Sequence, residues 1–154
     1  FLIEQKNEKN RKQIVEAICR DGFAIAQEYL PAASKGDVRL FLMDGEPLEK
    51  DSQVAAIHRV QPSGEIRSNI HQGGTAKRAV MNGQMKTIVE AVGPLLKQDG
   101  MFLAGLDVVG DKLMEINVFS PGGLIHASEF HDVDFMAAVV DAVERKVANF
   151  NRNT

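Results

Sequence analysis

The fold of this chain is decided by the stretch Gly105-Leu106-Asp107-Val108-Val109-Gly110-Asp111-Lys112-Leu113-Met114-Glu115-Ile116-Asn117. It lies within two apolar runs, Met101 to Val109 and Lys112 to Phe119, that meet at a Gly-Asp turn signal, and this pattern predicts a β-hairpin. Each run carries an acid where a buried strand normally has an aliphatic side chain. An isolated carboxylate in that position is costly unless a cation or hydrogen bonds compensate it, so the hairpin predicts a site as well as two strands.

Three oxygen donors of this hairpin, Asp107, Glu115 and Asn117, need a shared partner. Donors of this kind point to magnesium, which is usually held by one or two carboxylates and completes its octahedron with water and nucleotide phosphates. Strand parity turns this into a geometric prediction, because a plain two-residue turn would place Asp107 on the face opposite Glu115. We therefore expect a three-residue loop from Val109 to Asp111, or a bulge beside it, with Gly110 or Asp111 at positive φ.

Composition excludes several classes of function. The 154 residues fit one domain, and a net charge of -3 leaves no basic field for nucleic acid. No apolar run reaches the roughly 20 residues of a membrane span. Cys19 is the only cysteine, which rules out a disulfide within the chain and suits a reducing compartment. We expect a cytoplasmic protein that has no nucleic-acid or membrane partner.

A second hairpin or meander is expected upstream. Asp37 to Met43 alternates into the turn signal Asp44-Gly45-Glu46-Pro47, and Gln53 to Val60 returns as a strand. Before it, Phe23 to Pro31 predicts a strand that turns polar at Gln27 and stops at proline. Such a strand end is either an ordinary sheet edge or a backbone offered to a flat ligand, and both interpretations stay open.

Helical spacing predicts three helices around these strands. The first runs from a cap at Asn7 or Asn10 to about Arg20, with Cys19 packed as a small buried hydrophobe. The second runs from Gln84 to Gln98, with a kink at Gly93-Pro94. The last, from about Asp132 to Phe150, has an apolar stripe formed by Met136, Val139, Val140, Val143 and Val147. This pattern indicates an α+β fold with a mainly antiparallel sheet flanked by helices.

Arg59 is the most conspicuous cation, because it lies in an otherwise apolar strand and needs an anion or a carboxylate partner. An internal ion pair with Asp or Glu and a bound phosphate are equally open. His126, Glu129 and His131 fit no zinc spacing, so we interpret them as residues of a loop near a helix start.

The motifs together resemble a known family, bacterial glutathione synthetase of the ATP-grasp superfamily. The residues from Gly105 to Asp111, the run Glu115-Ile116-Asn117-Val118 and the pair Ser120-Pro121 resemble its magnesium-binding hairpin. Upstream, Gln27-Glu28-Tyr29-Leu30-Pro31 is similar to the family's adenine-binding strand end and Gly36-Asp37-Val38-Arg39 to the hairpin that follows. Arg67-Ser68-Asn69 with Gly73-Gly74 resembles the substrate-side loop, although this loop is closer to that of the ribosomal-protein glutamate ligases.

The resemblance implies roles for individual residues. The implied magnesium ligands are Asp107, Glu115 and Asn117. The implied nucleotide contacts are Gln27, Glu28, Tyr29, Leu30 and Asp37. Charge on the transferred phosphoryl group and on the acyl phosphate would be stabilised by Arg59 and Arg67, and the substrate would be bordered by Asn69, Gly73 and Gly74.

The implied activity is an ATP- and magnesium-dependent ligase that activates a carboxylate as an acyl phosphate and joins it to an amine, as in the union of γ-glutamylcysteine with glycine. The alternatives are a ligase that adds an amino acid to a protein or peptide, and a non-catalytic ATP-binding module. A purely structural role, with Asp107 and Glu115 paired to Arg59 and Arg67, is a further possibility. Small-molecule substrates and a homo-oligomer are the implied partners.

The family's substrate domain, first phosphate-binding lysine and glycine-rich phosphate loop would all precede Phe1. We therefore expect residues 1–154 to be the C-terminal part of an ATP-grasp domain, inactive by themselves.

Overall fold

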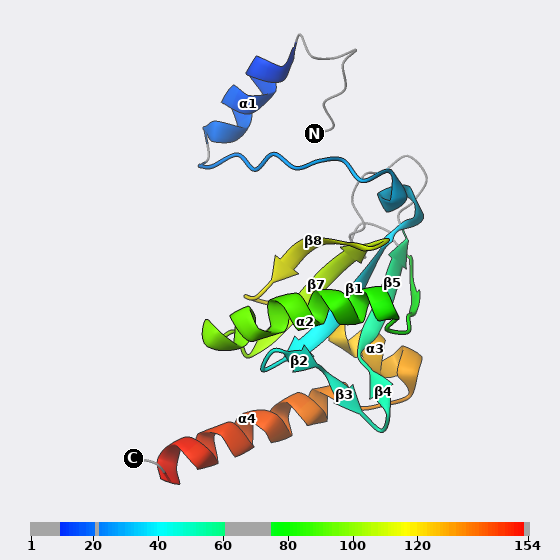
Figure 1. Cartoon of the computed structure of the whole chain (residues 1–154), viewed down its shortest axis with the longest axis vertical. Helices are drawn as coiled ribbons and strands as arrows, with labels where there is room; N and C mark the ends of the chain where they lie inside the picture. The colour runs from blue at the N-terminus through cyan, green and yellow to red at the C-terminus, as the bar shows by residue number, and fades with distance from the viewer. Residues whose placement is uncertain (1–9, 21, 61–74, 153–154) are drawn as a thin grey trace. The chain divides into compact units, whose positions relative to one another are not determined.

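The structure, a computed structural model, describes residues 10–20, 22–60 and 75–152 (Figure 1). The chain divides into two units, Phe1–Pro31 and Ala32–Thr154, and each is described by itself. In the first unit, helix α1 (Arg11–Cys19) begins after Asn10, as predicted. None of its residues is buried and Cys19 is exposed, so the expected packing of the thiol was wrong.

The strand expected from Phe23 to Pro31 is also wrong. Residues 23–30 have no regular secondary structure, and the chain continues into the 3-10 helix η2 (Pro31–Lys35). A strand exists only when a neighbouring strand takes its backbone N–H and C=O groups, and no described strand pairs with this segment. An apolar run that turns polar therefore did not suffice to predict a strand here.

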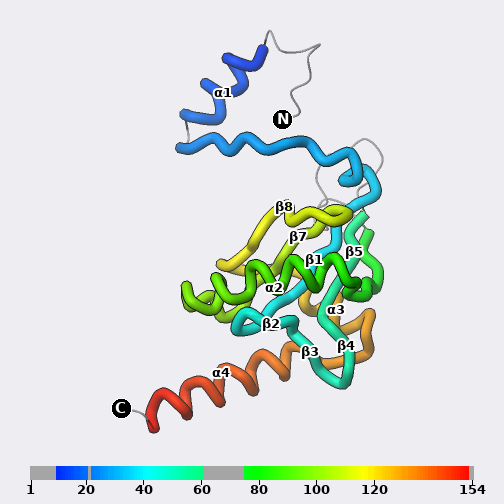
Figure 2. The backbone as a smooth tube through the Cα atoms, in the orientation of Figure 1, coloured from blue at the N-terminus to red at the C-terminus, as the bar shows by residue number. Residues whose placement is uncertain are grey.

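The second unit is built on one antiparallel sheet, whose order is β6-β5-β1-β7-β8 with β2 beside β1. The smooth trace in Figure 2 shows how the chain passes between these strands. A separate ladder joins two short strands between β2 and β5. The strands are β1 (Asp37–Met43), β2 (Glu46–Pro47), β3 (Glu49–Lys50), β4 (Gln53–Val54), β5 (Ala56–Val60), β6 (Thr75–Arg78), β7 (Leu103–Val109) and β8 (Lys112–Asn117).

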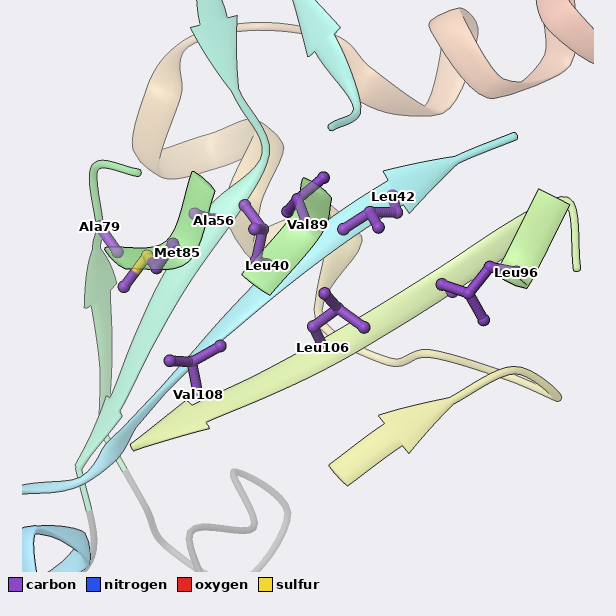
Figure 3. Close-up of a cluster of buried hydrophobic side chains, with 10 residues drawn as sticks. Leu40, Leu42, Ala56, Ala79, Met85, Val89, Leu96, Leu106 and Val108 are labelled. Carbon is purple, nitrogen blue, oxygen red and sulfur yellow. The ribbon is translucent and has the colours of Figure 1, made fainter. Parts of the chain in front are cut away.

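Helices cover both faces of this sheet, which confirms the predicted α+β class. Helix α2 (Gly83–Gln98) packs on one face, over Leu40, Leu42 and Leu106 (Figure 3). Helices α3 (Leu124–His131) and α4 (Phe135–Arg152) pack on the other face, over a second cluster that includes Phe41 and Ile57. Successive residues of a strand point to opposite faces, so a strand covered on both sides is apolar at consecutive positions, as the centre of β1 is.

Helix α2 begins and ends as the sequence predicts. The side chain of Asn82 caps it by accepting a hydrogen bond from the Met85 N–H at 2.9 Å. The helix continues through Pro94, and Gly93 packs directly on the hairpin turn below it. A Cβ built on Gly93 would lie 2.2 Å from the Gly45 carbonyl oxygen, so only glycine permits this approach.

Two features of the C-terminal region differ from the sequence prediction. The region around His126, Glu129 and His131, expected to be a loop, is the helix α3, and His131 is buried with its Nε2 3.0 Å from the Ala56 carbonyl oxygen. In α4 the residues packed on the core are Phe135, Ala138 and Val139. The rest of the predicted stripe, Met136, Val140, Val143 and Val147, is 42–55% exposed.

Candidate functional site

One face of the sheet collects the charged and polar side chains of four neighbouring strands. Asp37 on β1 lies opposite Arg59 on β5, and Arg39 lies opposite Asp107 on β7. Residues directly opposite each other in an antiparallel pair point to the same face, as do residues two apart along one strand. All four side chains therefore lie on the same face of the sheet as Phe41 and Ile57, the part of that face on which α3 and α4 pack.

The β7–β8 hairpin adds two more groups to this face. Asp107 lies opposite Glu115, and Gly105 lies opposite Asn117. The loop is only two residues long, Gly110 and Asp111, but the register shifts next to Asp107 because Met114 is an extra residue on β8. This bulge, one of the two predicted solutions, brings both acids to one face, and Gly110 has the predicted positive φ of +62°.

Asp107 is the centre of the cluster. Its side chain is 2% exposed, and both of its carboxylate oxygens accept hydrogen bonds from Arg39, from Nε at 2.8 Å and from Nη2 at 2.7 Å. Arg59 Nη2 lies 2.8 Å from Oδ2, and Asn117 Nδ2 lies 3.4 Å from the same oxygen. A buried carboxylate is thus compensated by two guanidinium groups, which is what its position in an apolar strand required.

Arg59 also pairs with Asp37, through Nε at 2.9 Å from Oδ2 and through Nη2. Burial by itself lowers the pKa of the Arg59 guanidinium, but attraction to Asp107 and Asp37 and the hydrogen bonds that Arg59 donates to both carboxylates outweigh it, so the pKa is raised. Of the two interpretations left open for Arg59, the structure shows the internal ion pair. One oxygen of Asp37, Oδ1, is buried and has no hydrogen-bond partner in the described part of the chain.

The donor set fits magnesium better than a softer metal. The described residues contain no group of three or more His, Cys, Asp and Glu side chains that could hold a metal ion. A metal on this face would be held by the carboxylates of Asp107 and Glu115 and the amide of Asn117. Two carboxylates with few other protein ligands are typical of Mg²⁺, whose remaining positions go to water and phosphate.

The other predicted site residues lie either in the first unit or outside the described residues. Gln27, Glu28, Tyr29 and Leu30 belong to the first unit and lie in its irregular segment. Arg67, Asn69, Gly73 and Gly74 lie outside the described residues. The substrate-side predictions are therefore untested, and so is the pairing of Glu115 with Arg67 that a purely structural role would require.

Sequence reasoning missed Arg39 as a member of the cluster. Besides its two bonds to Asp107, its Nη1 donates to the Gly122 carbonyl oxygen at 3.1 Å. The sequence feature that could have identified Arg39 is its position two residues after Asp37 in a strand that is otherwise apolar on both faces.

Among the described helices, none is both long and apolar enough to cross a membrane.

Comparisons with known proteins identify the family of this chain. The model of the ATP-grasp domain of prokaryotic glutathione synthetase matches residues 1–132. The glutathione synthetase of Agrobacterium fabrum is 41% identical over 122 residues, which cover 79% of this chain and 36% of the relative. That of Vibrio parahaemolyticus is 36% identical over 145 residues, 93% of this chain and 44% of the relative. That of Shewanella oneidensis is 36% identical over 149 residues, 96% of this chain and 45% of the relative. The chain thus spans less than half the length of each.

Proposed function

This chain belongs to the ATP-grasp family of prokaryotic glutathione synthetase, and from that premise we propose that it is the metal- and nucleotide-binding portion of an ATP-dependent ligase. The ligase would activate a carboxylate as an acyl phosphate and join it to an amine, with γ-glutamylcysteine and glycine as the substrates. The substrate domain, the first phosphate-binding lysine and the glycine-rich loop would belong to other parts of the enzyme. We place the enzyme in the cytoplasm.

The observation that carries the proposal is the shared face of Asp107, Glu115 and Asn117. The bulge at Met114 breaks the regular ladder of β8 and gives no packing advantage to Glu115, whose side chain it turns to a position that remains exposed. A structural hairpin needs neither the bulge nor the second acid. Both are explained if the two carboxylates hold one cation between them.

The bonds around Asp107 leave room for such a cation at one position. A carboxylate offers about four lone-pair directions, and three of those of Asp107 take N–H bonds of 2.8 Å or less. The fourth direction lies on Oδ1, which accepts only the bond from Arg39 Nε. The 3.4 Å contact of Asn117 Nδ2 is long and weak and falls on Oδ2, which already takes two guanidinium N–H groups. A cation would bind at Oδ1, and Asn117 would join it by turning its amide so that the oxygen faces the cation.

Each described residue then has a chemical task. Bound magnesium would neutralise charge on the ATP phosphates during phosphoryl transfer. Arg59 would present a guanidinium to the transferred phosphoryl group and to the acyl phosphate, at a site where positioning and electrostatics supply most of the catalysis. Asp37 supports a nucleotide contact through Oδ1, since a ligand hydroxyl would satisfy this buried acceptor. We assign Arg67 to the same charge-stabilising task and Asn69, Gly73 and Gly74 to the substrate border.

Nucleotide contacts by residues 27–30 remain part of the proposal. Residues 28–30 have no regular secondary structure in the first unit, and no described strand pairs with them. Backbone N–H and C=O groups outside a strand ladder can donate and accept the hydrogen bonds that a planar base needs.

The test is phosphate release by the full-length protein with magnesium, ATP, γ-glutamylcysteine and glycine, omitting each amino substrate in turn. Release that requires both substrates supports the proposal, and Asp107→Asn should abolish most of it. Asp111→Asn is the matched control, because Asp111 lies exposed at the turn of the same hairpin and outside the cluster. If ATP binds but neither substrate stimulates release, glutathione synthesis is wrong, and protein or peptide acceptors become the next substrates to test.

A further inference from the structure

Arg39 joins three separate parts of the site. Two of its N–H groups donate to the two oxygens of Asp107 on β7, and a third donates to the carbonyl oxygen of Gly122 in the loop before α3. The Arg39 side chain is only 11% exposed. A guanidinium is planar and its N–H groups have fixed directions, so a two-point bond to a carboxylate fixes the plane of that carboxylate as well as its charge.

The other partners of Asp107 hold only one of its two oxygens. Arg59 and Asn117 both reach the same oxygen, Oδ2, at 2.8 and 3.4 Å. The torsion about the last side-chain bond of Asp is broad and roughly two-fold, so contacts to a single oxygen restrain it less than a bond to both oxygens does. Among the described residues, Arg39 is the one that bonds to both Oδ1 and Oδ2, and so it contributes most to the direction of their lone pairs.

The third bond of Arg39 ties this orientation to a loop. Gly122 precedes Gly123, the N-cap residue of α3, which has a φ of +101°. The loop also packs closely on β7, since a Cβ built on Gly105 would lie 3.0 Å from Pro121 Cβ and 3.5 Å from Arg39 Cδ. The loop and the Asp107 carboxylate thus rest on opposite ends of one rigid side-chain group.

We propose that Arg39 is a positioning residue that orients the Asp107 carboxylate for magnesium and couples its orientation to the loop of residues 120–123. The proposal rests on the proposed function, because it takes Asp107 as a magnesium ligand. Lysine keeps the positive charge but cannot make the two-point bond and the bond to Gly122 together. Arg39→Lys therefore separates the effect of the positive charge at position 39 from the effect of orienting the Asp107 carboxylate.

The first experiment measures Mn²⁺ binding to the full-length protein by electron paramagnetic resonance, with the non-hydrolysable nucleotide AMP-PNP present. The Kd for Mn²⁺ should rise about 10- to 100-fold in Arg39→Lys, the usual effect of losing a residue that orients a metal ligand. The Kd for AMP-PNP without metal and the thermal midpoint should stay near the wild-type values, which a general structural defect would not allow. Arg145→Lys, at an exposed position of α4, is the control for the same chemical change.

The second experiment uses the wild-type protein and so does not depend on a variant that folds. Hydrogen exchange of the peptide that covers residues 120–127 should slow when Mn²⁺ and AMP-PNP bind together, but not with AMP-PNP alone. In Arg39→Lys this slowing should be lost. Wild-type Mn²⁺ affinity in Arg39→Lys, or an unchanged exchange rate in the wild type, would overturn the proposal. If the wild type itself binds no Mn²⁺ with nucleotide, the proposed function fails first.

Discussion

Removing the guanidinium of Arg59 should lower the free energy of unfolding, because it leaves a buried carboxylate without its cation. In Arg59→Met, Asp107 keeps its two-point bond to Arg39, but Asp37 loses every hydrogen bond that its carboxylate makes to Arg59. The Asp37 side chain is 2% exposed, so the charge left behind is buried and unpaired. Breaking a buried ion pair in this way costs about 3–5 kcal/mol of unfolding free energy.

The partner substitution is expected to cost less, and the double variant should reveal the coupling. Asp37→Asn removes the charge while Arg59 keeps Asp107 at 2.8 Å, so we expect a loss of about 1–3 kcal/mol. The double variant Arg59→Met with Asp37→Asn has no unpaired carboxylate at position 37. It should be more stable than the sum of the single losses predicts, by about 1–3 kcal/mol.

The assay is urea unfolding of the full-length protein, followed by far-ultraviolet circular dichroism. Unfolding midpoints should shift while the denaturant slope stays constant, which shows that stability and not the extent of unfolding has changed. Arg145→Met is the control, because this exposed arginine of α4 should matter by no more than about 0.5 kcal/mol. Additive losses at positions 37 and 59, or a cost for Arg59→Met no larger than the control, would refute the idea of a buried pair.

Three further predictions follow from the same structure. The stability cost of Arg59→Met should be the same at about pH 7 and at about pH 9. The pKa of Arg59 is higher in the folded protein than in the unfolded chain. Its stabilising effect is therefore complete at any pH below the unfolded-state pKa and is lost only as the pH rises through the folded-state pKa. Gly93→Ala should lower the unfolding free energy measured with urea by about 1–3 kcal/mol, because its Cβ would meet the Gly45 carbonyl oxygen. Gly83→Ala is the control: a Cβ there meets nothing within 4 Å, so this change should be neutral or should stabilise α2. Calorimetry should show that Mn²⁺ binds at least about tenfold more weakly without nucleotide. The guanidiniums of Arg39 and Arg59 already offset the charges of Asp107 and Asp37, so the nucleotide phosphates must supply the remaining metal ligands. Equal affinity with and without nucleotide would contradict this.

The hairpin shows how much local sequence can determine. Two apolar runs around Gly110-Asp111 predict the strands, and the demand that Asp107 and Glu115 share a face predicts an irregularity before any tertiary contact is known. The structure confirms the strands, the bulge and the positive φ of Gly110. This prediction is possible because successive side chains of a strand point to opposite faces. Two acids that would lie on opposite faces of a regular hairpin can share one face only if an extra residue shifts the register.

The failures have a different physical cause. Residues 23–30 have the composition of a strand, but a strand is defined by the partner that bonds to it, and composition does not contain the partner. Cys19 was expected to be buried because free cysteine usually is, although α1 buries none of its residues. In both cases the outcome depends on whether another segment of the chain pairs with or packs on the residue, and local sequence does not contain that information.

The sequence by itself determined the antiparallel α+β class, the acid-bearing hairpin and the need of Arg59 for an anionic partner. Only the tertiary structure decided which anion that is, because Asp37 and Arg59 meet through strand register and Arg39 reaches Asp107 across 68 positions of sequence. Register places side chains that are distant along the chain within hydrogen-bonding distance, and the low exposure of the face makes each of those pairings energetically decisive.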